Sequence, residues 1–130
     1  MRRRDLITVS LTAEEEERPT PLTFDMTTVG LPVISDGRVR NYIFVRFRLH
    51  LANGNDPLVV REKDPHLRDS IVRAAHRRPF TLEDDWNRLD GGPMAGWVMA
   101  AAATICGRGV VERVSILSQD PQRRVQVRRT

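Results

Sequence analysis

The stretch LPVISDGRVRNYIFVRFRLHL, residues 31–51, alternates between two kinds of side chain and decides the fold. Every second residue from Ile43 onward is apolar, and the residues between are aromatic or basic. Strict alternation is typical of a β-strand, whose successive side chains point to opposite faces of a sheet. One face of this strand is therefore predicted to join a core and the other to face outward. The apolar set is Ile43, Val45, Phe47, Leu49 and Leu51, and the other set is Tyr42, Phe44, Arg46, Arg48 and His50.

The dipeptide Asp36-Gly37 within this stretch predicts a tight β-hairpin. A type I′ turn needs a positive φ at both central residues, and Asp-Gly is one of the pairs that adopt it most readily. The turn would join a short strand at residues 30–35 to a long strand at residues 38–52. The sequence NGND, residues 53–56, has the composition of a turn and is expected to end the long strand.

Two helices and a closing strand are expected after the hairpin. DPHLRDSIVRAAHRR, residues 64–78, has apolar side chains at helical spacing, with Asp64 as the N-cap and Pro65 in the first turn. PMAGWVMAAAATIC, residues 93–106, is apolar almost all round and is predicted to be buried against the sheet. Single helical turns are considered at residues 58–63 and around Trp86. GVVERVSILSQD, residues 109–120, is the predicted closing strand.

These elements predict an α+β fold, with a small antiparallel sheet and helices packed on one face. Residues 1–23 combine a short apolar run, residues 5–11, with a linker of four consecutive glutamates and two prolines. The apolar run is a candidate strand. The folded domain is expected at residues 24–120, followed by an arginine-rich tail at residues 121–130. The expected core consists of Ile43, Val45, Phe47, Leu49, Leu67, Ile71, Trp97, Val98, Ile105, Val114 and Ile116.

The composition fits one soluble globular domain. Of the 130 residues, 40% are hydrophobic and 29% are charged. The formal charge is only +4, because 21 basic residues face 17 acidic ones. A nucleic-acid-binding domain concentrates its positive charge on one face, whereas most arginines here are scattered among acids. No apolar run is long enough for a transmembrane helix, and the first residues do not have the pattern of a signal peptide.

No catalytic, metal-binding or cofactor-binding site is predicted. Cys106 is the sole cysteine, so neither an internal disulfide nor a cysteine-based zinc site can form. Its position at the end of an apolar helix is typical of a structural thiol. The histidines lack the i, i+4 spacing of a helical metal site, and no glycine-rich phosphate loop is present. We therefore expect that the chain is not an enzyme and needs no cofactor.

The outward set Tyr42, Phe44, Arg46, Arg48 and His50 is the candidate interaction surface. Aromatic residues and arginine are enriched at the centres of protein interfaces, so this face is predicted to contact a second copy or a partner protein. Aromatic rings beside arginines are also found on surfaces that stack bases and contact phosphates. A small arginine-rich RNA- or DNA-binding module is therefore the alternative hypothesis. A solvated sheet face is the simplest interpretation, above all for Arg48 and His50.

Three segments of the chain carry a resemblance to a known family: LPVISDGRVRNYIFVRFRLHL, DPHLRDSIVRAAH and GVVERVSILSQDPQRR. Over about residues 29–124 the chain resembles the extramembrane domain of the flagellar basal-body-associated FliL family, in its alphaproteobacterial form. The resemblance implies a stomatin-like fold and a non-enzymatic accessory role at the basal body. It also implies contacts with motor or membrane-associated proteins, and homo-oligomers. Family members carry a membrane helix ahead of this domain. The implied location is thus the periplasmic face of the inner membrane if an anchor precedes Met1, and otherwise the cytoplasm.

Overall fold

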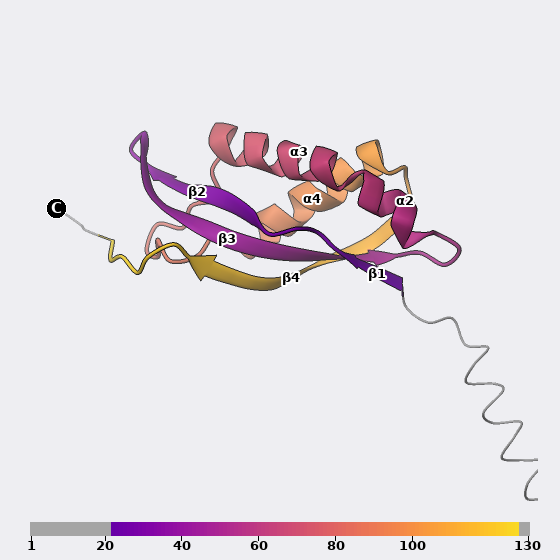
Figure 1. The fold of residues 1–130 in the computed structure, drawn as a ribbon. Coiled ribbons are helices and arrows are strands. Elements are labelled where there is room, and N and C mark those ends of the chain that lie inside the picture. The colour runs from indigo at the N-terminus through magenta and orange to yellow at the C-terminus, as the bar shows by residue number, and fades with distance from the viewer. Residues whose placement is uncertain (1–21, 128–130) are drawn as a thin grey trace, which may run out of the picture.

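The computed structural model describes residues 22–127, which form two layers, an antiparallel sheet with helices over one face (Figure 1). This confirms the predicted α+β class. The strands are β1 Leu22–Asp25, β2 Val29–Ser35, β3 Arg38–Leu51 and β4 Val111–Pro121, and the helices are α2 Pro57–Glu62, α3 Asp64–Arg77 and α4 Gly91–Ile105.

Strand β3 is the centre of the sheet and is hydrogen-bonded along both edges. β1 and β2 pair with successive parts of one edge, and β4 pairs with the other. Between β1 and β2, the three residues 26–28 lie opposite only two residues of β3, 46 and 47. This follows because Asp25 pairs with Arg48 and Val29 pairs with Val45. The backbone N of Met26 still donates to the carbonyl O of Phe47, at 3.0 Å. These two strands therefore form one sheet edge interrupted by a bulge.

The turn between β2 and β3 has the predicted geometry. Asp36 has a φ of 55° and Gly37 a φ of 74°, so both central residues adopt the positive φ that a type I′ turn requires. Aspartate tolerates this conformation better than most residues because of its short polar side chain. The hairpin sets the register in which Ser35 pairs with Arg38.

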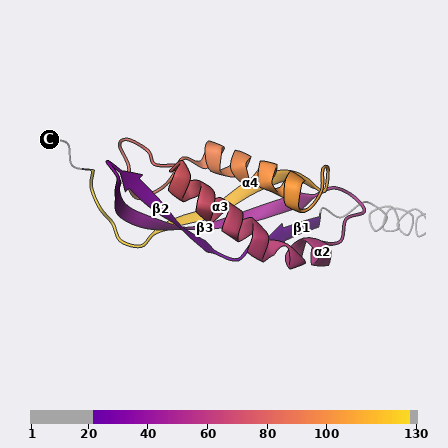
Figure 2. The same cartoon turned by 90° about the horizontal axis from the view of Figure 1, so that it is seen from above.

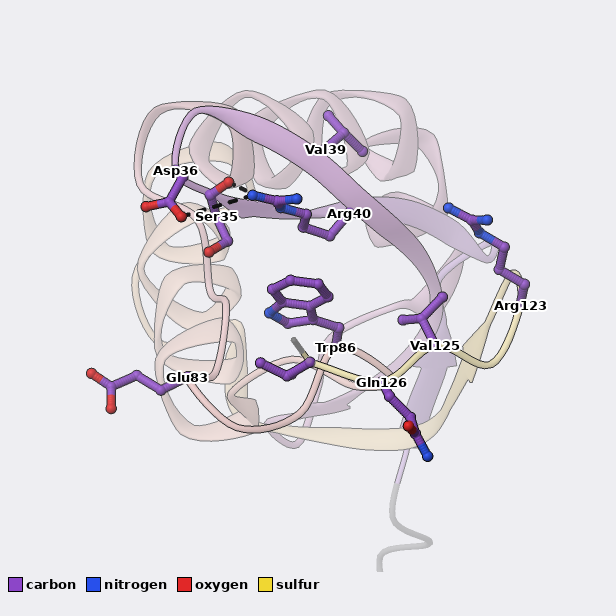
Figure 3. A pocket seen from close by; sticks show the side chains of 10 residues that line it. Ser35, Asp36, Val39, Arg40, Glu83, Trp86, Arg123, Val125 and Gln126 are labelled. Carbon is purple, nitrogen blue, oxygen red and sulfur yellow. Dashed lines mark hydrogen bonds and ion pairs between the residues drawn. The ribbon is translucent and has the colours of Figure 1, made fainter. Parts of the chain in front are cut away.

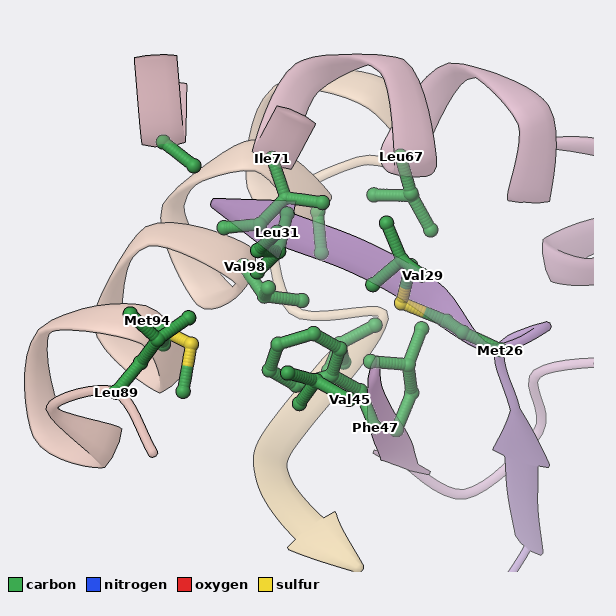
Figure 4. Close-up of a cluster of buried hydrophobic side chains, with 14 of the residues drawn as sticks. Met26, Val29, Leu31, Val45, Phe47, Leu67, Ile71, Leu89, Met94 and Val98 are labelled. Carbon is green, nitrogen blue, oxygen red and sulfur yellow. The ribbon is translucent and has the colours of Figure 1, made fainter. Parts of the chain in front are cut away.

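The inward side chains of β3 form the middle of the core (Figure 4). Ile43, Val45, Phe47 and Leu49 are fully buried, as the alternation predicts. Viewed from above, α3 and α4 lie side by side across this face of the sheet (Figure 2). α3 contributes Leu67 and Ile71 to the core, and α4 contributes Val98. The predicted residues Ile105, Val114 and Ile116 are half-buried and pack against the core from its edge.

The prediction for Trp97 was wrong, because its side chain is 37% exposed. Its helix packs against the sheet, as its apolar composition predicts, but along one side only. α4 buries only Met94, Val98 and Ala102, which follow one another at i, i+4 and i+8 along a single side. The physical reason is that α4 covers β4 at the margin of the sheet and has α3 on only one flank. Its glycines and alanines give no apolar periodicity, so its larger side chains decide which side faces inward.

The start of α3 also differs from the prediction. Its N-cap is Lys63, and Asp64 lies in the first turn, buried, where its Oδ2 accepts a hydrogen bond from Thr27 Oγ1 at 2.9 Å. Lys63 is at the same time the C-cap of α2, so one helix leads directly into the next. The turn considered at residues 58–63 is thus part of a real helix. The turn considered around Trp86 is not helical.

The boundaries of the folded part extend beyond those expected. β1 begins at Leu22, inside the predicted linker, and residues 122–127 follow β4 in a defined position. The candidate strand at residues 5–11 and the acidic run lie outside the described residues. Between residues 22 and 127, no helix is long and apolar enough to span a bilayer.

Replacing Phe47 with alanine should lower the free energy of unfolding by about 3–5 kcal/mol, because the fully buried ring leaves a cavity at the centre of the core. Urea denaturation followed by circular dichroism measures this change. Val39→Ala is the matched control, since Val39 lies on the same strand but is 48% exposed. Equal denaturation midpoints for Phe47→Ala and the unmodified chain would contradict the assignment.

Candidate interaction surface

The five outward residues of β3 lie on the face of the sheet that none of the helices within residues 22–127 covers (Figure 1). The pairing partners of β3 add residues to the same face, since directly paired residues of antiparallel strands point the same way. We call this surface the open sheet face. It consists of Thr23, Asp25, Gly30, Pro32, Tyr42, Phe44, Arg46, Arg48, His50, Arg113, Ser115, Ser118 and Asp120.

The two aromatic rings lie together at one end of the open sheet face. Phe44 is 41% exposed and pairs with Gly30, and Tyr42 is 38% exposed and pairs with Pro32. The Phe44 ring lies against Gly30 so closely that a Cβ added there would be 3.2 Å from its Cε1 atom. Glycine thus lets the ring lie flat across the neighbouring strand. We call Gly30, Pro32, Tyr42 and Phe44 the aromatic patch.

Arg48 is held by an acid on the neighbouring strand. Its Nε and one terminal nitrogen donate to the two carboxylate oxygens of Asp25, at 2.7 and 3.0 Å. This pair of parallel, charge-assisted hydrogen bonds fixes the guanidinium in the plane of the carboxylate. The hydrogen bond from Arg48 lowers the pKa of Asp25 below its usual value. Arg48 is therefore neutralised within the sheet.

His50 is held in one protonation state by two residues of β4. A terminal nitrogen of Arg113 lies 3.2 Å from His50 Nδ1, and Ser115 Oγ lies 2.8 Å from His50 Nε2. A guanidinium can only donate, so Nδ1 accepts, and in the neutral ring Nε2 carries the proton and donates to the serine. A histidine in this tautomer cannot take the proton of Ser115. The pair therefore lacks the geometry of an activated serine nucleophile.

The open sheet face thus divides into a paired half and an available half. Arg48 and His50 have partners in the sheet. Tyr42, Phe44 and Arg46 are exposed, and within residues 22–127 their side chains make no hydrogen bond or ion pair. The sequence predicted all five residues on one face. The partners of Arg48 and His50 lie on other strands and could not be predicted from the alternation.

A hollow of about 1020 Å³ opens beside the turn of the β2–β3 hairpin (Figure 3). The guanidinium of Arg40 lies 5.1 Å from the ring centre of Trp86, a cation–π contact. Arg40 Nε also donates to the carbonyl O of Ser35 at 3.2 Å. The lining residues include two acids, Asp36 and Glu83, and two bases, Arg40 and Arg123. This mixture favours no single charge of ligand.

Three side-chain amides hold together the segments that surround this hollow. Asn41 Nδ2 donates to the carbonyl O atoms of Trp86 and Arg123, both at 2.9 Å. Asn87 exchanges two hydrogen bonds with the backbone of Val125, at 2.7 and 2.9 Å, and Gln119 does the same with Leu89, at 2.7 and 3.3 Å. They fasten the loop between α3 and α4 to β3, to β4 and to residues 122–127. The one sign of these contacts in the sequence is Asn41, a polar residue at a position of β3 where the alternation places inward-facing side chains.

The remaining His, Cys, Asp and Glu side chains of the described residues were considered as metal ligands, and Cys106 as a reactive thiol. Within residues 22–127, no three His, Cys, Asp or Glu side chains are grouped so that they could hold a metal ion. Cys106 is half-buried, and burial raises the pKa of its thiol, which disfavours the reactive thiolate.

No protein-family model matches the sequence, and no curated protein matches it. The resemblance to the FliL family therefore rests on the three sequence segments alone and stays a prediction. The open sheet face is the surface whose geometry carries a functional argument.

The His50 ring should titrate at a lower pH than the ordinary value of 6.5, because burial and the nearby cations of Arg113 and Arg48 lower its pKa. The fold favours the neutral ring. Its contribution to the free energy of unfolding is therefore present above about pH 6.5 and is lost as the pH falls below that value. NMR titration of the histidine ring protons measures this pKa. Arg113→Gln should move it upward, whereas Arg73→Gln, on the helical side, should leave it unchanged. A His50 pKa at or above 6.5 would be inconsistent with the described contacts.

Proposed function

We propose that this chain is a non-enzymatic protein-interaction domain whose binding surface is the aromatic patch of the open sheet face. The partner is a second copy of the domain or another protein. The observation that carries the proposal is the exposure of Tyr42 and Phe44 next to each other on the central strand, where no helix of the described part of the chain covers them. Neighbouring exposed aromatic side chains are typical of protein-binding surfaces.

The support beneath the patch is rigid. β3 is hydrogen-bonded on both edges, and the side chains on its inner face are fully buried. A surface on such a strand loses little conformational entropy when it binds. Phe44 is positioned further by Gly30, which leaves room for the flat ring. The patch is therefore preorganised for a contact that buries both rings.

The patch alone is too small for a stable interface. Two aromatic side chains bury about 300–500 Å² together, whereas a stable complex buries about 800 Å² per partner. The partner must therefore also cover neighbouring residues of the open sheet face, the first of which is Arg46. Arg46 is exposed and lies beside the rings, so it is available for a charged or polar contact at the rim.

The same geometry disfavours the nucleic-acid alternative. Asp25 neutralises Arg48, and Asp120 lies opposite Phe44 on β4. A phosphate backbone passing over the rings would approach these carboxylates. Arg46 would be the only arginine of β3 on this face left to contact it. Tight nucleic-acid binding needs several such contacts.

The setting that we propose for this contact is an accessory role at the flagellar basal body. It rests on the resemblance of the three sequence segments to the FliL family. In that setting the partners are motor proteins, membrane-associated proteins or further copies of the domain.

Self-association through the patch should be lost in the variant Phe44→Ser, Arg46→Glu. Analytical ultracentrifugation of the full chain across micromolar to millimolar concentrations measures it. The control Val59→Ser, Arg61→Glu makes the same kinds of change on the exposed side of α2 and should associate as the unmodified chain does. Added salt should change the association only modestly, because apolar burial is not screened.

Two results would overturn this proposal. One is an unmodified chain that stays monomeric at every concentration while the patch variant binds every motor protein offered as tightly as the unmodified chain. The other is tight binding of a short single-stranded RNA at physiological salt that is lost in Arg46→Ala, Arg48→Ala, which would favour the nucleic-acid-binding module.

A further inference from the structure

A second surface, independent of the open sheet face, lies between α3 and α4 on the helical side. It is a groove of about 600 Å³, which we call the α3–α4 groove. Its lining includes Trp97, Phe80 and Pro93, together with Arg77 and Arg78 from the C-terminal end of α3. It thus combines an aromatic and proline surface with two cations.

One wall of the groove is a helix without charge. α4 contains no charged residue from Gly91 to Ile105, yet Gly96, Trp97 and Ala100 on its groove side are exposed. A helix so poor in polar residues is normally covered. The indole Nε1 of Trp97 donates to Ser70 Oγ on α3, at 3.3 Å, so the ring is held across the helix pair. An apolar segment is the kind of partner that this wall can accept.

The other wall is basic. Lys63, His66, Arg73 and Arg77 line an adjoining hollow of about 500 Å³ along α3, in which the sole acid, Asp69, is paired with Arg73 at 3.0 Å. Arg77 and Arg78 are exposed and have no acidic partner within residues 22–127. A partner is therefore expected to carry carboxylates beside its apolar part.

The chain itself contains a segment with this chemistry. Residues 14–21, EEEERPTP, place four glutamates directly before two prolines, and they lie outside the described residues. Proline-rich segments bind grooves lined by aromatic rings and lose little entropy when they do so. We propose that the α3–α4 groove binds residues 14–21 of a second copy of this chain, with the prolines on Trp97 and Phe80 and the glutamates beside Arg77 and Arg78.

The groove is too far away for the segment of the same chain. The hydrogen bond between Thr27 and Asp64 places the start of α3 beside the β1–β2 junction. From there Arg77 lies about 20 Å along the helix, at 1.5 Å per residue. β2 runs in the same direction as α3. The backbone N of Ile34, near the end of β2, donates to Thr81 Oγ1, which follows the end of the helix.

β1 lies on the other side of the junction, so that Leu22 is about 16 Å further from the groove, at 3.3 Å per residue. The total is about 35 Å. A fully extended chain from Leu22 to Glu14 spans only about 27 Å. The long side chains of an ion pair would close this gap for Glu14 of the same chain, but Pro19 is only three residues from Leu22 and stays within about 10 Å of it. The prolines therefore reach the groove only from a second molecule.

A charge exchange between two full-length variants tests this contact. Both variants also carry Phe44→Ser and Arg46→Glu, which remove the aromatic patch. Variant one adds Arg77→Glu and Arg78→Glu, and variant two adds lysine in place of Glu14, Glu15, Glu16 and Glu17. Each should self-associate about tenfold more weakly than the chain with Phe44→Ser and Arg46→Glu alone in low-salt sedimentation velocity, and their mixture should regain the association. A matched control, Arg38→Glu with Arg61→Glu in the same background, makes the same change in charge away from the groove and should behave as the chain with Phe44→Ser and Arg46→Glu alone.

A synthetic peptide of residues 13–22 provides a second measurement. Added to the full-length variant Phe44→Ser, Arg46→Glu, in which the aromatic patch is removed, it should change the tryptophan emission with an affinity that falls as salt is added. The change should be absent in the same chain with Trp97→Phe.

Three results would overturn the inference: a mixture of the two charge variants that associates no better than either alone, a peptide without effect on the emission, or equally tight binding of a peptide with glutamine at the four glutamate positions. The last would mean that the groove takes an apolar partner without regard to charge. None of these results depends on the aromatic patch.

Discussion

The double-sided pairing of β3 is the constraint on which the rest of the structure depends. Because both of its edges are occupied by hydrogen bonds, its side chains can point only toward the helices or away from them. A slip of one residue would turn Arg46 and Arg48 into the core and expose Phe47. The alternation in one strand therefore fixes which face of the sheet the helices cover. Both surfaces proposed for binding follow from that choice.

The two surfaces differ in physical character. The aromatic patch is apolar, sits on the sheet, and has neighbouring charges that are mostly paired within it, such as Arg48 with Asp25. The α3–α4 groove joins an uncharged helix to arginines that have no acidic partner among residues 22–127. Contacts at the patch should therefore depend little on salt, and contacts at the groove should depend on it strongly. Used together, they would let one domain bind on both of its faces at once.

The sequence predicted those features that depend on local patterns. The hairpin followed from Asp36-Gly37, the inward and outward faces of β3 from period 2, and the position of α3 from period 3.6. α4 was placed correctly along the chain, but its exposed side was missed because glycine and alanine mark no face. β1 was missed because four residues after a proline-containing segment are too few to show alternation.

Features that depend on distant partners could not be predicted. Asn41 bonds to backbone atoms 45 and 82 residues away, and these contacts create the hollow beside Trp86. β4 carries two register shifts, opposite Arg46/Phe47 and His50/Leu51, that no local pattern indicates. The candidate surface was predictable as a set of five residues. Its division into a paired and an available half was not, because Asp25, Arg113 and Ser115 come from other strands.

The most direct test of this account is an aspartate scan along β3, with one substitution at each position from residue 42 to residue 50 and the free energy of unfolding measured in urea. The cost of substitution should alternate along the strand. Aspartate at Ile43, Val45, Phe47 or Leu49 should cost several kcal/mol or prevent folding, because it buries an unpaired charge. Aspartate at Tyr42, Phe44 or Arg46 should cost about 1 kcal/mol or less, because these side chains face solvent. A uniform profile, or equal costs at Phe44 and Phe47, would contradict the claim that β3 separates a buried face from an available one.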